Sequence, residues 1–216
     1  MGINWNFSNP GAFGDSFGPL SGIMAGIAAV SAIAAFQAQQ AEIERAKIRE
    51  IDEDKLRRKS DFERTFFQLL EAFQRIVTET DIHGSGPTKT GRDAFRAILQ
   101  KFESENARLA SAEKSWTSLI EYYRNDLNHY FRFMYHIVNF VHNSDMEDKY
   151  FYTRILRSSL SDSELTLVAL NCAYGEGNPK FKRLVERYSI LHNISQEQRT
   201  RWGLDGLFKK VAFLKA

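Results

Sequence analysis

The sequence predicts an all-α protein with an N-terminal transmembrane helix, a long juxtamembrane helix and a cytoplasmic helical bundle. Three observations support this fold class. No charged residue occurs between Ser16 and Ala41. Neither proline nor glycine occurs between Ala41 and the loop at residues 83–91. No stretch shows the alternating pattern of a strand bounded by hairpin turns.

The apolar part of the uncharged segment, "FGPLSGIMAGIAAVSAIAAF", covers residues 17–36. A helix of about 20 residues is about 30 Å long, the thickness of the hydrocarbon core of a bilayer. A signal peptide is one alternative, although no lysine or arginine precedes the apolar run. An alanine-rich core helix of a soluble protein is another. The favoured prediction is a membrane span over residues 16–37, preceded by a tail of residues 1–15.

Charges on the two sides of the predicted span indicate its orientation. Only one charged side chain, Asp15, lies before it, whereas seven basic residues follow it closely: Arg45, Lys47, Arg49, Lys55, Arg57, Arg58 and Lys59. Because positively charged flanks stay in the cytoplasm, we expect the tail outside and the body of the chain in the cytoplasm.

Small residues recur at every fourth position of the span, at Gly18, Gly22 and Gly26. This spacing lets helices approach closely in lipid and therefore predicts a homo-oligomer. The alternative is chance spacing in an alanine-rich segment.

Residues 38–82 are predicted to form a helical stalk, as one long helix or as two with a bend. Large apolar residues in its second half follow one another at intervals of four and three, which places them on one helix face: Phe62, Phe66, Leu69, Phe73 and Ile76. That face must pack on other elements. The loop "HGSGPTKTG" ends the helix and begins the cytoplasmic domain, residues 83–216.

Within this domain the apolar pattern predicts helices over residues 92–102, 107–142 and 150–160. A capping box at Ser161 and Glu164 predicts a further helix to about residue 173, and Pro179 begins another. The sequence "SQEQ" predicts a second capping box at Ser195.

The composition limits the classes of function. With 216 residues the chain is long enough for one domain and an appendage, and its net charge of +2 argues against a strongly basic nucleic-acid binder while leaving local patches open. The single cysteine, Cys172, excludes an internal disulfide and is predicted to be buried. From Pro179 onward nine basic residues stand against three acidic ones. This excess predicts either a solvated face or a surface for nucleic acid, anionic lipid or an acidic partner.

The stretch "YYRNDLNHYFRFMYHIVNF", residues 122–140, carries an apolar stripe and, on another helix face, a polar stripe without acidic residues. The polar stripe consists of Asn125, His129, Arg132, His136, Asn139 and Asn143. It is either a face that holds phosphate or nucleic acid, or a buried polar seam paired with carboxylates of another helix, which we favour. In the seam, Arg132 pairs with Glu164, or else with Asp162, because an unpaired buried charge costs several kcal/mol.

An enzymatic interpretation starts from "RNDLNH", in which Arg124 and His129 match the arginine and histidine of HEPN-type ribonucleases. The pattern is short, and "RYSILH", residues 187–192, has the same spacing. No phosphate-loop, metalloprotease or serine-hydrolase motif occurs, and no cysteine or histidine cluster has metal-ligand spacing. We therefore expect no cofactor and no metal, and an enzyme is the less favoured alternative.

Three stretches together resemble a known family. "GAFGDSFGPLSGIMAGIAAVSAIAAFQAQQAEIE" is similar to that family's lead into a membrane helix, and "FERTFFQLLEAFQRIV" with "GRDAF" is similar to its juxtamembrane core. "HYFRFMYHIVNFV" and "YTRILRSSLSDSELTLVALNC" are similar to its most recognisable segment. The chain thus resembles the putative phage abortive infection proteins, which include membrane-anchored defence effectors found with some retrons. Its residues on the family pattern are His129, Tyr130, Phe131, Arg132, Tyr135, Tyr152, Arg157, Leu160, Ser161, Glu164 and Leu165.

The resemblance covers about residues 10–175, and the chain departs from many relatives in having one apolar span rather than two. It implies an anti-phage effector of the bacterial inner membrane, toxic on activation and held in check by a partner such as a retron reverse transcriptase with its DNA. Two alternatives stay open: a membrane-tethered HEPN-type ribonuclease, and a non-catalytic helical module that binds a protein or a nucleic acid.

Overall fold

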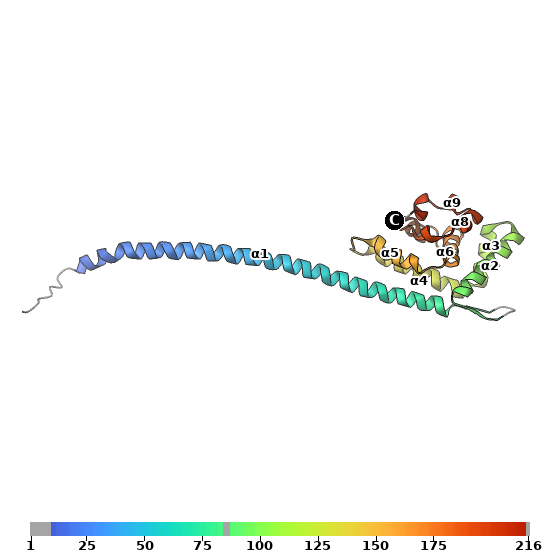
Figure 1. Cartoon of the computed structure of the whole chain (residues 1–216), viewed down its shortest axis with the longest axis horizontal. Coiled ribbons are helices and arrows are strands. Elements are labelled where there is room, and N and C mark those ends of the chain that lie inside the picture. The colour runs from blue at the N-terminus through green and yellow to red at the C-terminus, as the bar shows by residue number, and fades with distance from the viewer. Residues whose placement is uncertain (1–9, 84–86, 215–216) are drawn as a thin grey trace, which may run out of the picture. The chain divides into compact units, whose positions relative to one another are not determined.

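The computed structural model describes residues 10–83 and 87–214, with side chains from Ser21 onward. The chain divides into two compact units, residues 1–58 and 59–216, and the first helix, α1 (Pro10–Glu79), contributes to both. Apart from one pair of two-residue strands, the described elements are helices (Figure 1). The all-α prediction is therefore confirmed.

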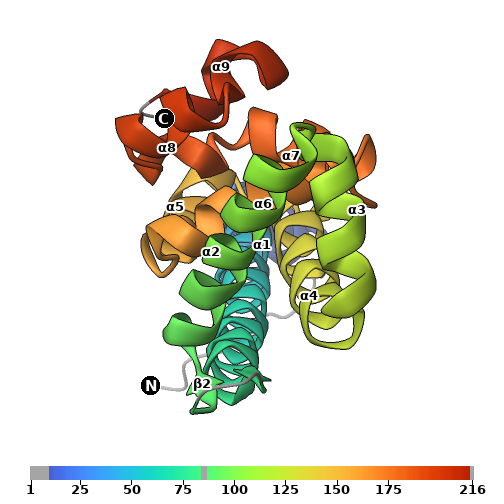
Figure 2. The same cartoon turned by 90° about the vertical axis from the view of Figure 1, so that its right-hand side faces the viewer.

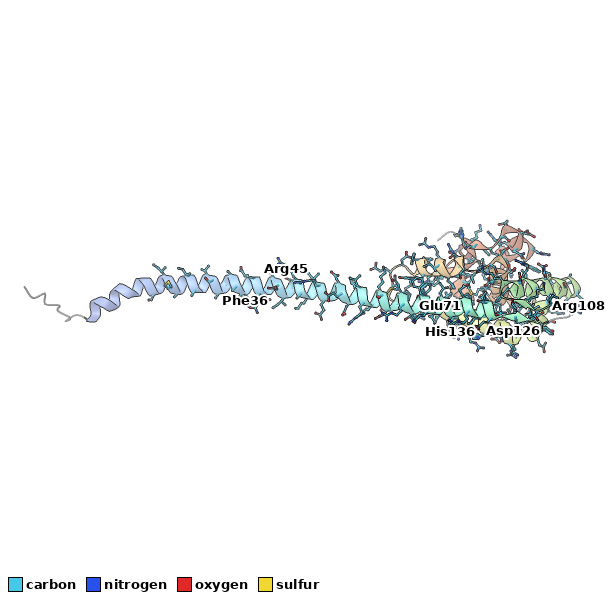
Figure 3. All side chains as sticks on the ribbon, turned by 60° about the horizontal axis from the view of Figure 1, so that its bottom comes forward. Phe36, Arg45, Glu71, Arg108, Asp126 and His136 are labelled. Atoms are coloured by element: carbon cyan, nitrogen blue, oxygen red, sulfur yellow. The ribbon has the colours of Figure 1, made fainter. Side chains whose placement is uncertain are left out.

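In the first unit, α1 runs without interruption through the residues predicted as the span and the first half of the stalk. Six apolar side chains of the span are each between 59% and 68% exposed: Ile23, Met24, Ile27, Val30, Ile33 and Phe36. Figure 3 labels the last of these. The hydroxyl of Ser31 donates to the carbonyl of Ile27 at 2.8 Å, so this polar group is satisfied within the helix, as lipid requires.

Among the described residues, one helix is long and apolar enough to cross a membrane, and it lies near the N-terminus. Its most apolar window has a mean hydropathy of 1.6, and none of that window is buried in the chain. These side chains form an apolar surface that no described part of the chain covers.

The second unit begins with residues 59–79 of α1, about six turns. The strands β1 (Asp81–Ile82) and β2 (Lys89–Thr90) then pair antiparallel, so the predicted loop is a small hairpin. The helices that follow are α2 (Arg92–Leu109), α3 (Ala112–Tyr122), α4 (Arg124–Asn143), α5 (Lys149–Ser158), α6 (Asp162–Tyr174) and α7 (Lys180–Arg187). Short helices complete the chain: η1 (Ile190–Asn193), α8 (Gln196–Arg201), α9 (Leu204–Leu207) and η2 (Lys210–Phe213).

Several predicted helix boundaries are correct because capping residues set them. Ser161 and Glu164 form the predicted capping box at the start of α6, and Pro179 directly precedes α7. At Ser195 only half of the second box forms, because the side chain accepts from the amide of Gln198 while the side chain of Gln198 accepts from Trp202.

Two predicted boundaries are wrong. The first body helix continues to Leu109, seven residues beyond its predicted end, and the predicted helix over residues 107–142 is two helices. Ala110 closes α2 in the left-handed conformation, and Ser111 caps α3 by accepting from the amide of Lys114. Tyr123, with φ −103° and ψ 24°, separates α3 from α4 without a glycine or proline to signal it.

The core of this unit forms where α6 is surrounded by its neighbours. Helix α6 is buried on all sides from Glu164 to Cys172, and it contacts α2, α3, α7 and η1 (Figure 2). The predicted apolar face of α1 joins this core: Phe62 stacks on Phe140 at 5.0 Å between ring centroids, and Phe73 lies 5.1 Å from Tyr130. Cys172 is buried as predicted, and burial raises the pKa of its thiol.

Candidate functional site

The polar stripe of α4 lies on the surface of the unit. Asn125, His129, Arg132 and His136 are exposed, and Asn139 is half-buried. His136 is labelled in Figure 3 at the edge of this unit. The apolar stripe on the other face of α4 is buried instead. The preferred interpretation as a buried seam is therefore wrong, because packing on α1, α5 and α7 covers only the apolar face.

The expected pair of Arg132 and Glu164 is also absent. Arg132 is exposed and makes no ion pair with any residue that the structure describes. Glu164 is fully buried, and its oxygen Oε2 accepts from the amide of Ser161 at 2.9 Å and lies 3.7 Å from Nε of Arg92. The hydroxyl of Tyr130 donates to Oε1 at 3.4 Å. Glu164 thus serves the start of α6, with Arg92 as its cationic neighbour.

An open cleft of about 680 Å³ lies between α4, α7 and the segment before η2. Tyr135, Asn139 and His142 line it from α4. Basic residues line it from the other side: Lys180, Arg183 and Arg187 of α7, with Lys209. The three basic residues of α7 are spaced three and four apart, which places them on one helix face beside Leu184, while Phe181 and Val185 are buried on the other.

Most of the positive charge in this cleft is not neutralised. Its one carboxylate, Glu186, lies 3.7 Å from Nζ of Lys209 and also accepts from the backbone amide of that residue at 3.1 Å. Among the residues that the structure describes, Lys180, Arg183 and Arg187 have no acidic partner within 4 Å. The cleft is therefore a site of positive potential that suits an anionic ligand.

His142 at the wall of the cleft responds to this potential. Its Nδ1 lies 2.8 Å from the hydroxyl of Tyr188, and its backbone carbonyl accepts from Nζ of Lys149. Burial, and then the charges of Arg187 and Lys149, lower the pKa of His142 below its usual value.

A second, smaller pocket of about 150 Å³ adjoins the cleft, and Tyr135 and Lys180 line both. It adds Arg132 and Asn128 from α4, and Asn171 with Glu176 from α6 and the following turn. The structure thus brings two residues of the predicted stripe, Arg132 and Asn139, together with the basic C-terminal part. Asn125, His129 and His136 line neither pocket.

The turn after α6 holds α7 in place at this pocket. Gly177 packs so closely on Asn171 that a Cβ atom there would lie 2.9 Å from its Nδ2 and 3.0 Å from its carbonyl oxygen. At Gly175 a Cβ atom would lie 2.5 Å from Oδ1 of the same asparagine. Glycine is therefore needed at both positions, because the backbone there lies close to Asn171. The turn that the two glycines form leads to Lys180, which lines the pocket.

The far end of the cleft is supported by a buried arginine. Arg157 of α5 donates from Nη1 to the carbonyl of Ser189 at 2.9 Å, and the hydroxyl of Ser189 donates to the carbonyl of Val211 at 2.7 Å. Ser189 has a left-handed backbone, with φ of 50°. Arg157 therefore holds the chain between Arg187 and Val211, two residues that line the cleft.

The ribonuclease pair does not assemble a site in this structure. Arg124 and His129 are both exposed, and five residues of helix separate their directions by about 140°. The ring of His129 stacks on Phe133, and neither residue lines the cleft or the pocket. Among residues 21–83 and 87–214, no three acidic, histidine or cysteine side chains are placed to hold a metal ion.

Sequence patterns did not assign Tyr135, Arg183 and Arg187 to a common site. The spacing of the basic residues in α7, with apolar residues between them, was a usable signal for a basic helix face. The contact of that face with α4 could not be predicted from the sequence, because about 45 residues separate the two segments and only the tertiary fold brings them together.

Comparison with known proteins identifies a family for this part of the chain. The family model described as "Putative phage abortive infection protein" matches residues 122–199. No curated protein and no solved structure matches the chain. The matched residues run from the end of α3 into α8 and include every residue that lines the cleft except Lys209 and Val211. The match agrees with the resemblance inferred from the sequence: residues 122–199 are similar to the putative phage abortive infection proteins.

Proposed function

We propose that this protein is a membrane-anchored effector of bacterial anti-phage defence. The observation that carries the proposal is the family match over residues 122–199, which supports a role in phage defence. The exposed apolar residues of α1 support the anchor, because six large apolar side chains in water on one short segment are unfavourable.

The orientation follows from the charges beside the anchor. Basic residues gather after the span, so the tail faces outward and the helical body lies in the cytoplasm. In a Cys172→Ala background, Glu53→Cys on the exposed stalk should react with a membrane-impermeant maleimide only after the inner membrane is permeabilised. Labelling of intact spheroplasts would show the opposite orientation.

The role in defence is tested by plating phages on bacteria that express the full chain. Ile27→Arg/Ile33→Arg places two charges in the span, each unfavourable by about 2.5–3.5 kcal/mol at its centre. Ile48→Arg/Ile51→Arg makes the same change at exposed positions of the stalk, outside the span. We expect the first variant to leave the membrane fraction and lose protection, and the second to keep both. Protection by a chain that has left the membrane would contradict the anchored effector.

The finer part of the proposal concerns control of the effector. We propose that the active protein stops the growth of the infected cell, and that a partner encoded with it, such as a retron reverse transcriptase with its DNA, holds it inactive. Expression of the chain alone should then arrest growth, and expression with the neighbouring genes should not. Equal growth in both cultures would argue against such control.

A further inference from the structure

The cleft and the smaller pocket share two lining residues and are together called the recess, which carries repeated positive charge. Tyr135 and Lys180 belong to both, Arg132 lies in the pocket, and Arg183 and Arg187 lie in the cleft. Of the two carboxylates in this recess, Glu186 is engaged by Lys209, and Glu176 lies in the exposed turn at the pocket. Several cations in sequence along a recess suit a ligand with several phosphates in sequence.

Groups of the kind that contact bases also line the recess. Tyr135 offers a half-buried aromatic ring, and Asn128, Asn139 and Asn171 offer amide donors and acceptors. Single-stranded nucleic acids bind proteins in this way, with the backbone along a cationic groove and the bases against aromatic rings and polar side chains. A phospholipid headgroup has no aromatic base to stack on this ring.

The recess is large enough for a single strand but too small for a duplex. A cleft of about 680 Å³ lies in the range that holds a drug-sized ligand, so it admits about one or two nucleotides at a time and not the width of a duplex. The overall charge of +2 does not oppose this, because the positive residues are concentrated locally.

We propose that this recess binds a single-stranded nucleic acid. The phosphates lie on Lys180, Arg183 and Arg187 of α7, with Arg132 at the pocket, and the bases lie against Tyr135 and the asparagines of α4 and α6. Because the site lies in the second unit and does not involve the span, loss of membrane anchoring leaves nucleic-acid binding intact, and the two proposals fail separately.

The test measures binding to the full chain in neutral detergent. Labelled single strands of about ten nucleotides, as RNA and as DNA, are titrated by fluorescence anisotropy over a series of salt concentrations, with the duplex of the same sequence as competitor. Binding of either single strand, with weak competition by the duplex, supports the proposal. The RNA and DNA arms show whether a 2′-hydroxyl contributes.

Two matched variants assign binding to the recess. Lys180→Gln/Arg183→Gln should weaken binding at least about tenfold and make the slope of log affinity against log salt shallower by about 1.4, as expected for two lost phosphate contacts. Lys114→Gln/Arg154→Gln removes the same charge from exposed positions outside the recess and should change affinity less than about twofold.

If the recess variant loses helicity, Lys180→Arg/Arg183→Lys keeps the charges and should bind like the original chain. Absence of oligonucleotide binding at low salt, or equal weakening by the control variant, would overturn the assignment.

Discussion

Glu164 and Arg132 both lie on the family pattern, but the structure places them in opposite surroundings. Glu164 is fully buried at the start of α6, where it accepts hydrogen bonds from Ser161 and Tyr130. Arg132 is exposed at the edge of the smaller pocket. A buried, bonded carboxylate stabilises the fold, whereas an exposed cation without a partner is available to a ligand.

Stability measurements should separate these two roles. Glu164→Ala removes the capping box and leaves the buried Tyr130 hydroxyl without an acceptor, so the free energy of unfolding should fall by about 2–4 kcal/mol. Arg132→Ala should change it by less than about 0.5 kcal/mol, as for an exposed position. Chemical unfolding of the full chain in detergent, followed by circular dichroism, gives both values. A larger loss for Arg132→Ala than for Glu164→Ala would return Arg132 to a structural role.

His142 should make stability depend on pH. Its pKa in the folded chain is lowered, with Tyr188, Arg187, Lys149 and Glu186 as its polar surroundings. The unfolded chain therefore binds a proton at His142 at a higher pH than the folded chain does. The contribution of His142 to stability is complete above about pH 6.5 and decreases below it.

The measurement is the melting temperature between neutral and mildly acidic pH. His142→Gln should flatten the decrease below pH about 6.5, whereas His136→Gln, on the exposed face of the same helix, should keep the wild-type profile. Identical profiles for wild type and His142→Gln would show that the lowered pKa of this residue does not contribute to the pH dependence of stability.

At the scale of elements, the turn between α6 and α7 determines the shape of the candidate site. Gly175 and Gly177 pack on Asn171, which itself lines the smaller pocket, and the turn leads directly to Lys180. The matched segment, residues 122–199, therefore contains the turn, the basic helix that it positions and all of the cleft lining except Lys209 and Val211.

Gly177→Ala should disturb this arrangement. The added methyl group would meet the side-chain and backbone atoms of Asn171 at about 3 Å, and overpacking of this kind lowers stability by about 1–3 kcal/mol. Gly206→Ala, where a Cβ atom meets nothing within 4 Å, is the control and should cost less than about 1 kcal/mol. Thermal unfolding of the two variants measures the difference. An unchanged midpoint for Gly177→Ala would show that the turn can shift without cost.

Sequence patterns predicted elements wherever the signal was local. The spacing of Phe62, Phe66 and Phe73 indicated the packed face of α1, and Ser161 with Glu164 indicated the start of α6. The break at Tyr123 had no such signal, since neither glycine nor proline marks it. The exposure of the polar stripe and the cleft depend on contacts of α4 with α7, which are distant in sequence. Local periodicity shows two faces of α4 but not which partner covers each.

At the scale of the whole molecule, the chain combines a helix long and apolar enough to cross a membrane with a helical body whose residues 122–199 are similar to the phage abortive infection proteins. Gly22 and Gly26 lie on one face of that helix, and a Cβ atom at either position meets nothing within 4 Å in the chain. No described part of the chain packs on them, and we propose that helices of several copies contact one another through this face.

Gly22→Leu/Gly26→Leu should therefore dissociate a homo-oligomer while keeping the anchor, because leucine favours insertion but blocks close helix approach. Cross-linking in isolated membranes should show higher-order bands for the wild type and mainly monomer for this variant. Ala28→Leu/Ala35→Leu adds similar bulk about half a turn away, on the opposite helix face, and should retain those bands. If oligomers are required for defence, protection from phage falls with the first variant only. A wild type that yields no cross-linked bands, or two variants that lose them equally, would exclude the glycine face as the contact.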